Sequence, residues 1–136
     1  MYLFDTDCLS NIVKKHPSPL LLKKLNVLPQ EFQFSTSVNV CEIYYGAYRS
    51  KNRKRILKAY EEKVFPNLNI LAFDTESGRI CGRLKAGLEK KGLPKSEPDL
   101  RIAAIAIQHN MVLVTGNTRH FKGIPGLNVE DWINGI

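Results

Sequence analysis

Residues Tyr2-Leu3-Phe4-Asp5-Thr6-Asp7-Cys8-Leu9-Ser10 begin with a short apolar run and pass directly into two acids. The apolar residues that follow, Leu9, Ile12 and Val13, recur at a helical spacing, and this segment must end before Pro17. The stretch therefore predicts a buried strand that leads into a helix. Because an unpaired charge is costly to bury, the position of Asp5 beside this strand needs a chemical reason.

The same alternation continues along the chain. Short apolar runs predict strands at residues 2–4, 32–34, 68–72, 111–114 and 127–129. Between them, helices are expected over 19–28, 37–48, 75–91 and 100–109, with Ser18-Pro19 starting the first of these and Gly92 ending the third. Strands that alternate with helices predict an α/β fold with a parallel sheet covered on both faces.

Three helix starts carry more detailed expectations. Ser37 is expected to cap the helix over 37–48, with Val38, Cys41, Tyr45 and Tyr48 facing inward. Asp99 is expected at the N-cap of the helix over 100–109, and Asp7 at the N-cap of the first helix.

Length and charge restrict the class of protein. The 136 residues are expected to form one domain over 1–136, and the net charge of +7 favours a phosphate-rich partner over an acidic one. A lysine-rich solvated surface would give the same balance. The basic run 49–55 (RSKNRKR) either follows a phosphate backbone or forms a solvated helix face between two packed helices, and the second is the simpler expectation.

The cysteines and the hydropathy pattern bear on the compartment. Cys8, Cys41 and Cys81 are odd in number and lack a close metal-binding spacing, so buried free thiols in a reducing compartment are expected. The amino terminus does not have the pattern of a secretory signal, and no apolar run is long enough to span a membrane. We therefore expect a cytoplasmic protein.

Asp5, Glu42 and Asp99 each lie beside an apolar run that resembles core. Ligands of open α/β sheets collect at the carboxyl ends of the strands, where Asp5 and Asn117 should both lie. Clustered carboxylates repel one another, and a bound dication reverses that effect. Mg²⁺ and Mn²⁺ prefer such oxygen ligands, and a water that they activate can attack a phosphodiester.

Four segments resemble the PIN-domain ribonucleases, and specifically the VapC toxins of prokaryotic toxin–antitoxin pairs. They are residues 2–10 (YLFDTDCLS), 37–47 (SVNVCEIYYGA), 98–106 (PDLRIAAIA) and 113–121 (LVTGNTRHF), the last followed by IPGL at 124–127. Each segment alone is a weak signal, whereas four in order over essentially the whole chain are a strong one.

The resemblance implies a three-layer α/β/α sandwich with a five-stranded, mostly parallel sheet. It also implies a Mg²⁺- or Mn²⁺-dependent endoribonuclease of RNA, inhibited by a cognate antitoxin in a hetero-oligomer, and a homodimer of the toxin itself. By position, Asp5, Glu42 and Asp99 become the metal-binding acids, and Asn117 joins them as the fourth catalytic residue. Many relatives have an acid at the position of Asn117, so one metal ion is expected instead of two. Relatives often have asparagine at the position of Asp7, which either adds charge to the site or caps the first helix.

Further residues are candidates for supporting roles. Thr6 and Ser37 could hydrogen-bond the acids or contact substrate, and Arg119 could bind a phosphate. Tyr44 and Tyr45 could stack on bases, while His120 is expected to be a half-exposed packing residue. The leucine-rich segment 20–28 is expected to form part of a partner surface, in this family an antitoxin groove.

Two other functions remain open from the sequence. Asp5 and Asp7 resemble the Asp-x-Asp start of haloacid-dehalogenase-type phosphatases, with Asp5 as nucleophile and Asp7 as general acid. That class requires a later acidic pair, and the corresponding place here reads Gly116-Asn117-Thr118. The other alternative is an RNA-binding module that keeps the fold without catalysis.

Overall fold

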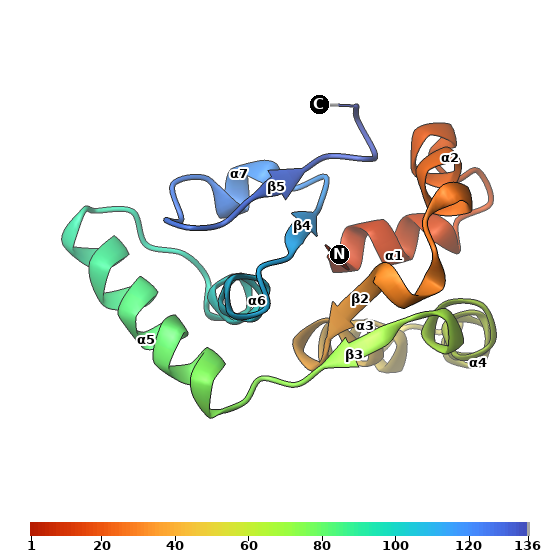
Figure 1. Cartoon of the computed structure of the whole chain (residues 1–136). Helices are drawn as coiled ribbons and strands as arrows, with labels where there is room; N and C mark the ends of the chain where they lie inside the picture. Colours follow the sequence, from red (N-terminus) through yellow and green to blue (C-terminus); the bar gives the residue numbers. More distant parts are fainter. Residues whose placement is uncertain (136) are drawn as a thin grey trace.

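Five parallel strands form a single sheet in the computed structural model, which describes residues 1–135 (Figure 1). The strands lie in the order β3-β2-β1-β4-β5, and each neighbouring pair is parallel. Their bounds are β1 Tyr2–Phe4, β2 Gln33–Thr36, β3 Asn69–Leu71, β4 Val112–Val114 and β5 Val129–Glu130. The five predicted strands are confirmed, with shifts of one or two residues at several ends.

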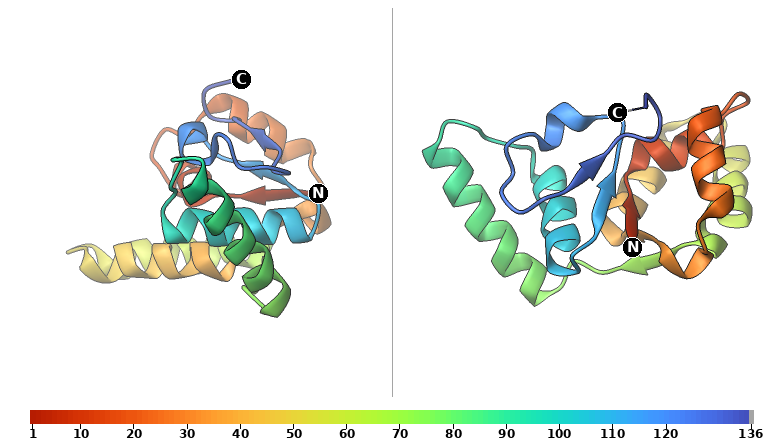
Figure 2. Two further views of the ribbon diagram at one scale, coloured as in Figure 1. Left: turned by 90° about the vertical axis from the view of Figure 1, so that its left-hand side faces the viewer. Right: turned by 45° about the horizontal axis from the view of Figure 1, so that its top comes forward.

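Seven α-helices connect and cover the strands in the described chain. They are α1 Thr6–Ile12, α2 Pro19–Val27, α3 Ser37–Arg49, α4 Arg53–Ala59, α5 Thr75–Lys90, α6 Glu97–Gln108 and α7 Thr118–Phe121. Short turns of 3-10 or π geometry occupy Gln30–Phe32, Tyr60–Val64 and Phe65–Asn67. Because helices lie on both faces of the sheet, as the two views of Figure 2 show, the predicted three-layer α/β/α sandwich is confirmed.

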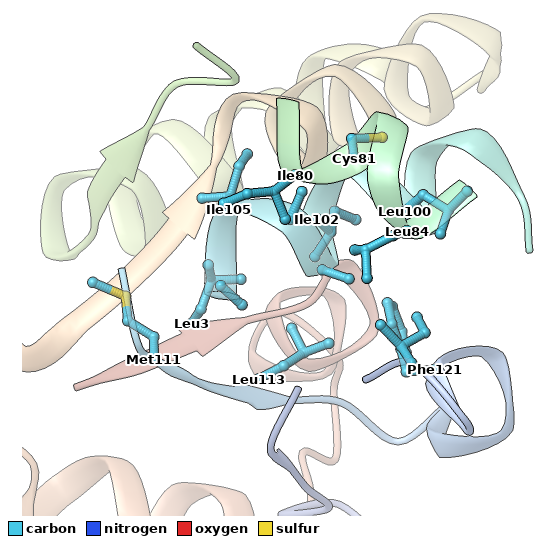
Figure 3. Packing of buried hydrophobic residues seen from close by; sticks show 14 of the residues in the cluster. Leu3, Ile80, Cys81, Leu84, Leu100, Ile102, Ile105, Met111, Leu113 and Phe121 are labelled. Atoms are coloured by element: carbon cyan, nitrogen blue, oxygen red, sulfur yellow. The ribbon is translucent and has the colours of Figure 1, made fainter. Parts of the chain in front are cut away.

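Alternation along the central strands divides the core into two layers. Leu3 and Leu113 pack with the apolar residues of α5 and α6 (Figure 3), whereas Phe4 and Val114 pack with those of α1 and α2. Successive side chains of a strand point to opposite faces, so each central strand contributes to both layers. Five consecutive residues of α6, from Ile102 to Ala106, are fully buried, which explains its nearly continuous apolar sequence.

The strand order also determines where a ligand can approach. The order reverses between β1 and β4, which are adjacent although most of the chain separates them. In open α/β sheets, the crevice beyond the carboxyl ends of the strands at such a reversal is the usual ligand site. Asp5 follows β1 and Thr115 follows β4, so both lie at this crevice.

The inward face of α3 differs from the expected one. Asn39, Ile43 and Ala47 are buried, while Cys41, Tyr45 and Tyr48 are exposed and Val38 is half-buried. The first turn explains the difference, because the N-cap is Thr36 and not Ser37. The Thr36 hydroxyl accepts from the Asn39 backbone N–H at 3.1 Å and donates to the Asn39 side chain at 2.6 Å. This contact turns the face that begins at Asn39 toward the sheet.

Two expected caps are also wrong. Helix α6 begins at Glu97 with Ser96 as its N-cap, so Asp99 lies in the first turn, where its backbone N–H donates to the Ser96 hydroxyl at 3.3 Å. The N-cap of α1 is Asp5 and not Asp7, because the Asp5 carboxylate accepts from the Thr6 backbone N–H. The predicted starts of α2 at Ser18-Pro19 and the end of α5 before Gly92, which has a φ of 70°, are confirmed.

The structure bears on the expected state of the cysteines and on the expected lack of a membrane span. Cys8, Cys41 and Cys81 are free thiols, and Cys41 is exposed instead of buried. None of the described helices has the length and apolar character needed to cross a membrane.

Truncation of Leu113 tests the layer between the sheet and α6. Leu113→Ala should lower the free energy of unfolding by about 2–5 kcal/mol, because it removes a fully buried side chain and leaves a cavity. Val27→Ala is the matched control, since Val27 is exposed at the end of α2 and should change stability by less than about 0.5 kcal/mol. Urea denaturation of both variants measures the difference, and equal losses would contradict this description of the core.

Candidate active site

Asp5 is a buried carboxylate at the junction of β1 and α1. Its side chain and backbone together are only 6% exposed, and its backbone N–H donates to the Val114 carbonyl at 3.0 Å. Carboxylate Oδ1 accepts from the Thr6 backbone N–H at 2.8 Å and from Asn39 Nδ2 at 3.0 Å. The other oxygen, Oδ2, accepts from the Thr115 hydroxyl at 2.8 Å. Three separate segments therefore hold this one side chain.

Burial dominates the electrostatics of Asp5. It raises the pKa of this carboxyl from 3.8 to about 6, even though the hydrogen bonds from Thr115 and Thr6 lower it. The negative charges of Asp7 and Glu42 raise the pKa further. The ionised form is thus held under repulsion from its neighbours, a condition that a bound cation would relieve.

Glu42 faces Asp5 from the second turn of α3. The Thr6 hydroxyl donates to Glu42 Oε1 at 3.0 Å and accepts from Asn39 Nδ2, also at 3.0 Å. Burial raises the pKa of Glu42, the hydrogen bond from Thr6 lowers it, and the charge of Asp99 raises it. Asn39 and Thr6 therefore link the two carboxylates of Asp5 and Glu42 in one hydrogen-bonded chain.

Asp99 completes the row of acids from α6. Its side chain is 19% exposed, and its Oδ2 lies 3.5 Å from Nδ1 of His120 on α7. Its negative charge raises the pKa of Glu42. The structure thus gathers Asp5, Glu42 and Asp99 from β1, α3 and α6 at one edge of the sheet. His120 is exposed and contacts an acid instead of serving only in packing.

The carboxylates of these acids fit a hard divalent cation, but the geometry limits how many of them can bind one ion directly. Carboxylate oxygens in mutual repulsion are suitable ligands for Mg²⁺ or Mn²⁺. However, no three Asp, Glu, His or Cys side chains among residues 1–135 are grouped so that they could hold one metal ion. The arrangement is therefore compatible with Mg²⁺ bound through one or two carboxylates while it keeps several waters, which is its usual mode in proteins.

Asn117, the fourth predicted catalytic residue, follows β4. Its backbone N–H donates to the Thr115 hydroxyl at 3.0 Å, and this hydroxyl is the one that donates to Asp5. The Asn117 side chain is exposed and starts α7 without capping it. Thr115 thus connects the turn that carries Asn117 to the buried carboxylate.

Asp7 has a role that differs from the predicted cap. Its Oδ2 accepts from the Gly116 backbone N–H at 2.7 Å, and its Oδ1 lies 3.3 Å from the Thr115 hydroxyl. A Cβ at position 116 would lie only 2.8 Å from Asp7 Oδ2, so glycine is needed for this close approach. Asp7 therefore clamps the turn after β4 to the start of α1.

Sequence reasoning missed Asn39 and Thr115 and misplaced Ser37. The Thr36-to-Asn39 spacing is a capping signal that could have placed Asn39, and Thr115 directly follows a predicted strand. The Ser37 hydroxyl accepts from the Phe73 backbone N–H at 3.3 Å, and within residues 1–135 it does not hydrogen-bond an acid. The Tyr44 ring stacks on Phe65 with 5.9 Å between centroids, whereas Arg119 is exposed on α7.

A cavity reaches Glu42, one of the three acids. It has a volume of about 370 Å³ and lies between α3 and α6. Its lining includes Ser37, Glu42, Phe73 and Arg101. The Arg101 guanidinium lies 5.3 Å from the centroid of the Phe73 ring, so the cavity combines an acid, a cation and an aromatic surface.

Comparison with known proteins assigns this arrangement a family. A model of the PIN domain matches residues 2–127. The chain is 32% identical to the tRNA(fMet)-specific endonuclease VapC of Salmonella typhimurium over 96% of this chain and 97% of that protein. It is 31% identical to Ribonuclease VapC2 of Haemophilus influenzae over 97% and 98% of the two chains. A chain in the crystal structure of VapBC2 from Rickettsia felis bound to a promoter DNA fragment superimposes with a TM-score of 0.88 at 31% identity, covering 96% and 98%.

Replacement of Asp5 should stabilise the protein in a pH-dependent way. Because the folded pKa of about 6 exceeds the unfolded 3.8, ionisation destabilises the fold as pH rises through this interval, by roughly 3 kcal/mol once complete. Asp5→Asn avoids this cost and can keep its contacts, since the Thr115 hydroxyl can also accept. We expect a gain of about 1–3 kcal/mol near pH 8 that disappears below about pH 4.

Asp74 provides a control of opposite sign. Hydrogen bonds from the Ser77 backbone and from Gln108 lower the pKa of Asp74, so its ionised form stabilises the fold above the unfolded pKa, and this contribution is lost as pH falls. Asp74→Asn should therefore not stabilise the protein near pH 8. Denaturation curves at several pH values compare the two variants, and a destabilised Asp5→Asn at high pH would contradict the burial argument.

Proposed function

We propose, from the premise that this chain belongs to the PIN-domain family and within it to the VapC ribonucleases, that Asp5, Glu42 and Asp99 form a metal-dependent endoribonuclease site. The observation that carries the proposal is the buried Asp5 carboxylate, coupled through Asn39 and Thr6 to Glu42 at the reversal between β1 and β4. A carboxylate with a raised pKa beside other acids in a cleft is typical of a functional site.

Asp5 and Asp99 would be the direct ligands of Mg²⁺ or Mn²⁺. Of the two modes expected for Glu42, direct binding or binding through water, we propose the second, because no three acids among residues 1–135 are grouped closely enough to hold one ion directly. When bound, such an ion supplies a deprotonated water at neutral pH and stabilises negative charge on the phosphate oxygens. The protein groups keep the carboxylates oriented, since Thr6, Asn39 and Thr115 donate to them. Asn117 would orient a water or the substrate through its amide, and because it adds no charge we propose one ion and not two.

The substrate that fits this site is RNA. The chain has a net charge of +7 with its acidic centre included, which attracts a polyanion, while the acids themselves would repel it without a cation. The cavity beside Glu42 can admit a nucleotide, and Arg119 is exposed on α7 for contact with a phosphate. Thr6 and Ser37 lie at the same edge, although neither hydroxyl is free of protein contacts.

We further propose that the protein is the toxin of a toxin–antitoxin pair. A groove of about 300 Å³ lies among α1, α2 and the turn Tyr60–Val64, and its apolar lining includes Leu9, Leu22 and Leu25. A segment of a cognate antitoxin would bury this surface, as the crystallised VapBC2 relative forms a toxin–antitoxin complex. A homodimer of the toxin within a hetero-oligomer is part of the same proposal. The free cysteines and an RNA substrate suit action in the cytoplasm.

The phosphatase alternative finds little support in the geometry. Asp7, which would be its general acid, accepts from the Gly116 backbone N–H and packs against the turn after β4. The end of β4 supplies Asn117 where that class needs acids. The remaining alternative is a module that binds RNA without cleaving it, and the cleavage experiment distinguishes it from a ribonuclease.

Cleavage of RNA with and without the metal tests the proposal. The purified protein should cleave RNA with Mg²⁺, and EDTA should abolish cleavage. Asp5→Asn and Asp99→Asn should each lower the rate by at least about 100-fold, because each removes a carboxylate from the proposed metal site. Gel analysis of end-labelled RNA measures the products.

Lys90→Gln serves as the control for a surface change, since Lys90 is exposed at the end of α5, and it should leave the rate nearly unchanged. Cleavage that survives both acid substitutions would overturn the mechanism. Release of phosphate from small phosphomonoesters with intact RNA would favour the phosphatase, and binding of RNA with neither activity would favour the non-catalytic module.

A further inference from the structure

The exposed face of α3 leads from the acids to the far end of the helix. Tyr45 and Arg49 are three and seven residues beyond Glu42, so the three side chains lie along one side of α3. At 1.5 Å per residue, Arg49 is about 10 Å along the axis from Glu42. Of these three residues, Tyr45 was expected to face inward, and the structure instead leaves it exposed.

Two exposed tyrosines on this surface are each paired with an arginine. Tyr45 is 62% exposed, and the Arg49 guanidinium lies 5.1 Å from its ring centroid and donates to its hydroxyl at 3.2 Å. Tyr48 is 55% exposed, with the Arg53 guanidinium 5.9 Å from its ring centroid. Each arginine lies over its tyrosine ring, and both tyrosines nevertheless keep more than half of their surface exposed.

The basic run lies at the tip of the hairpin formed by α3 and α4. Figure 2 (left) shows this pair of helices extending beyond the rest of the molecule. Five basic side chains gather there, and none has an acidic partner within 4.0 Å among the described residues; they are Arg49, Lys51, Arg53, Lys54 and Arg55. The run is solvated and lies between two packed helices, as expected, and it forms the projecting turn between α3 and α4 together with the adjoining helix ends.

We propose that Tyr45, Arg49 and this basic tip form a second RNA contact that holds a single-stranded part of the substrate beside the acids. The proposal deepens the proposed ribonuclease function and rests on RNA as its substrate. Proteins that bind single strands combine positive charge along the backbone with aromatic rings on which bases stack. The α3 surface supplies both, in continuity with Glu42.

Charge favours RNA over a protein as the occupant. Covering five unpaired cations with protein would require matching acids or a large desolvation cost. Phosphates neutralise them and release counterions, which is favourable. A second copy of this chain would bring an equally basic tip, and two such tips in contact would repel.

Binding of a labelled RNA without cleavage tests the contact. The Asp5→Asn protein in EDTA is titrated into a fluorescein-labelled single-stranded RNA of mixed sequence, about 20 nucleotides long, and anisotropy reports binding. Adding Arg49→Gln and Arg53→Gln removes two phosphate contacts. The slope of log affinity against log salt should fall in magnitude by about 1.4, and affinity near 0.1 M salt should fall roughly 25-fold.

Lys14→Gln with Lys15→Gln is the matched control in the same background. Both lysines are exposed beyond the end of α1, a helix that starts at the acids and runs away from them, and the charge change is identical. This pair should change affinity by less than about two-fold. An equal loss in both double variants would mean that only net charge matters, and would overturn a specific contact at the tip.

Two variants of Tyr45 distinguish the contribution of base stacking from that of charge. Tyr45→Ala should weaken binding about ten-fold, while Tyr45→Phe should retain most of the affinity, because it keeps the ring and loses only the hydroxyl bonded by Arg49. Unchanged affinity in Tyr45→Ala and in the arginine double variant would overturn the proposal. The proposal would also be overturned if these variants lost self-association in sedimentation while their RNA affinity stayed unchanged. The surface would then be a protein interface.

Cleavage assays keep this proposal distinct from the proposed function. If the otherwise unmodified protein fails to cleave RNA but the tip variants still weaken binding, the ribonuclease proposal fails and the RNA contact stands. If the protein cleaves RNA while binding does not depend on the tip, the ribonuclease proposal stands and the RNA contact at the tip fails.

Discussion

The buried carboxylate of Asp5 is the constraint on which the site depends. It lies where β1 meets α1, and it is kept ionisable by donors from α1, α3 and the turn after β4. Since a lone buried charge is unfavourable, each of these donors must be delivered to within hydrogen-bond distance by the fold. Parallel pairing of β1 with both β2 and β4 makes this delivery possible, because the segments that follow those strands emerge at one edge.

The same constraint explains several features that look unrelated. Thr36 caps α3 and orients Asn39 inward, so Asn39 reaches Asp5 and Thr6. That rotation in turn leaves Tyr45 and Tyr48 outside, next to a projecting basic tip. Asp7 and Gly116 close the turn that carries Asn117. An acidic centre inside a basic chain is thus achieved by concentrating the acids where several segments meet and leaving the cations on the periphery.

Much of the fold was accessible from the sequence, and the reasons for success and failure are physical. Strands and long helices follow apolar periodicity, which records burial directly, so β1, β4, α5 and α6 were placed well. The row Asp5, Glu42 and Asp99 was found because each acid interrupts an apolar run. The caps at Ser37, Asp7 and Asp99 were wrong because neighbouring polar residues offer the same chemistry, and a shift of one to three residues decides among them. The inward face of α3 was wrong because its tyrosines have large apolar rings but are not buried.

By itself, the sequence determined the alternation of strands and helices, the parallel sheet and the acids at its edge, since these depend on residue type and spacing along the chain. Only the tertiary structure decided which groups serve those acids. Asn39, Thr115 and Gly116 act through contacts with residues that are 34 to 110 positions away or that lie across the β1–β4 reversal. Local patterns carry no information about such partners, because a hydrogen bond depends on distance and direction in space, which are established only when the strands pair.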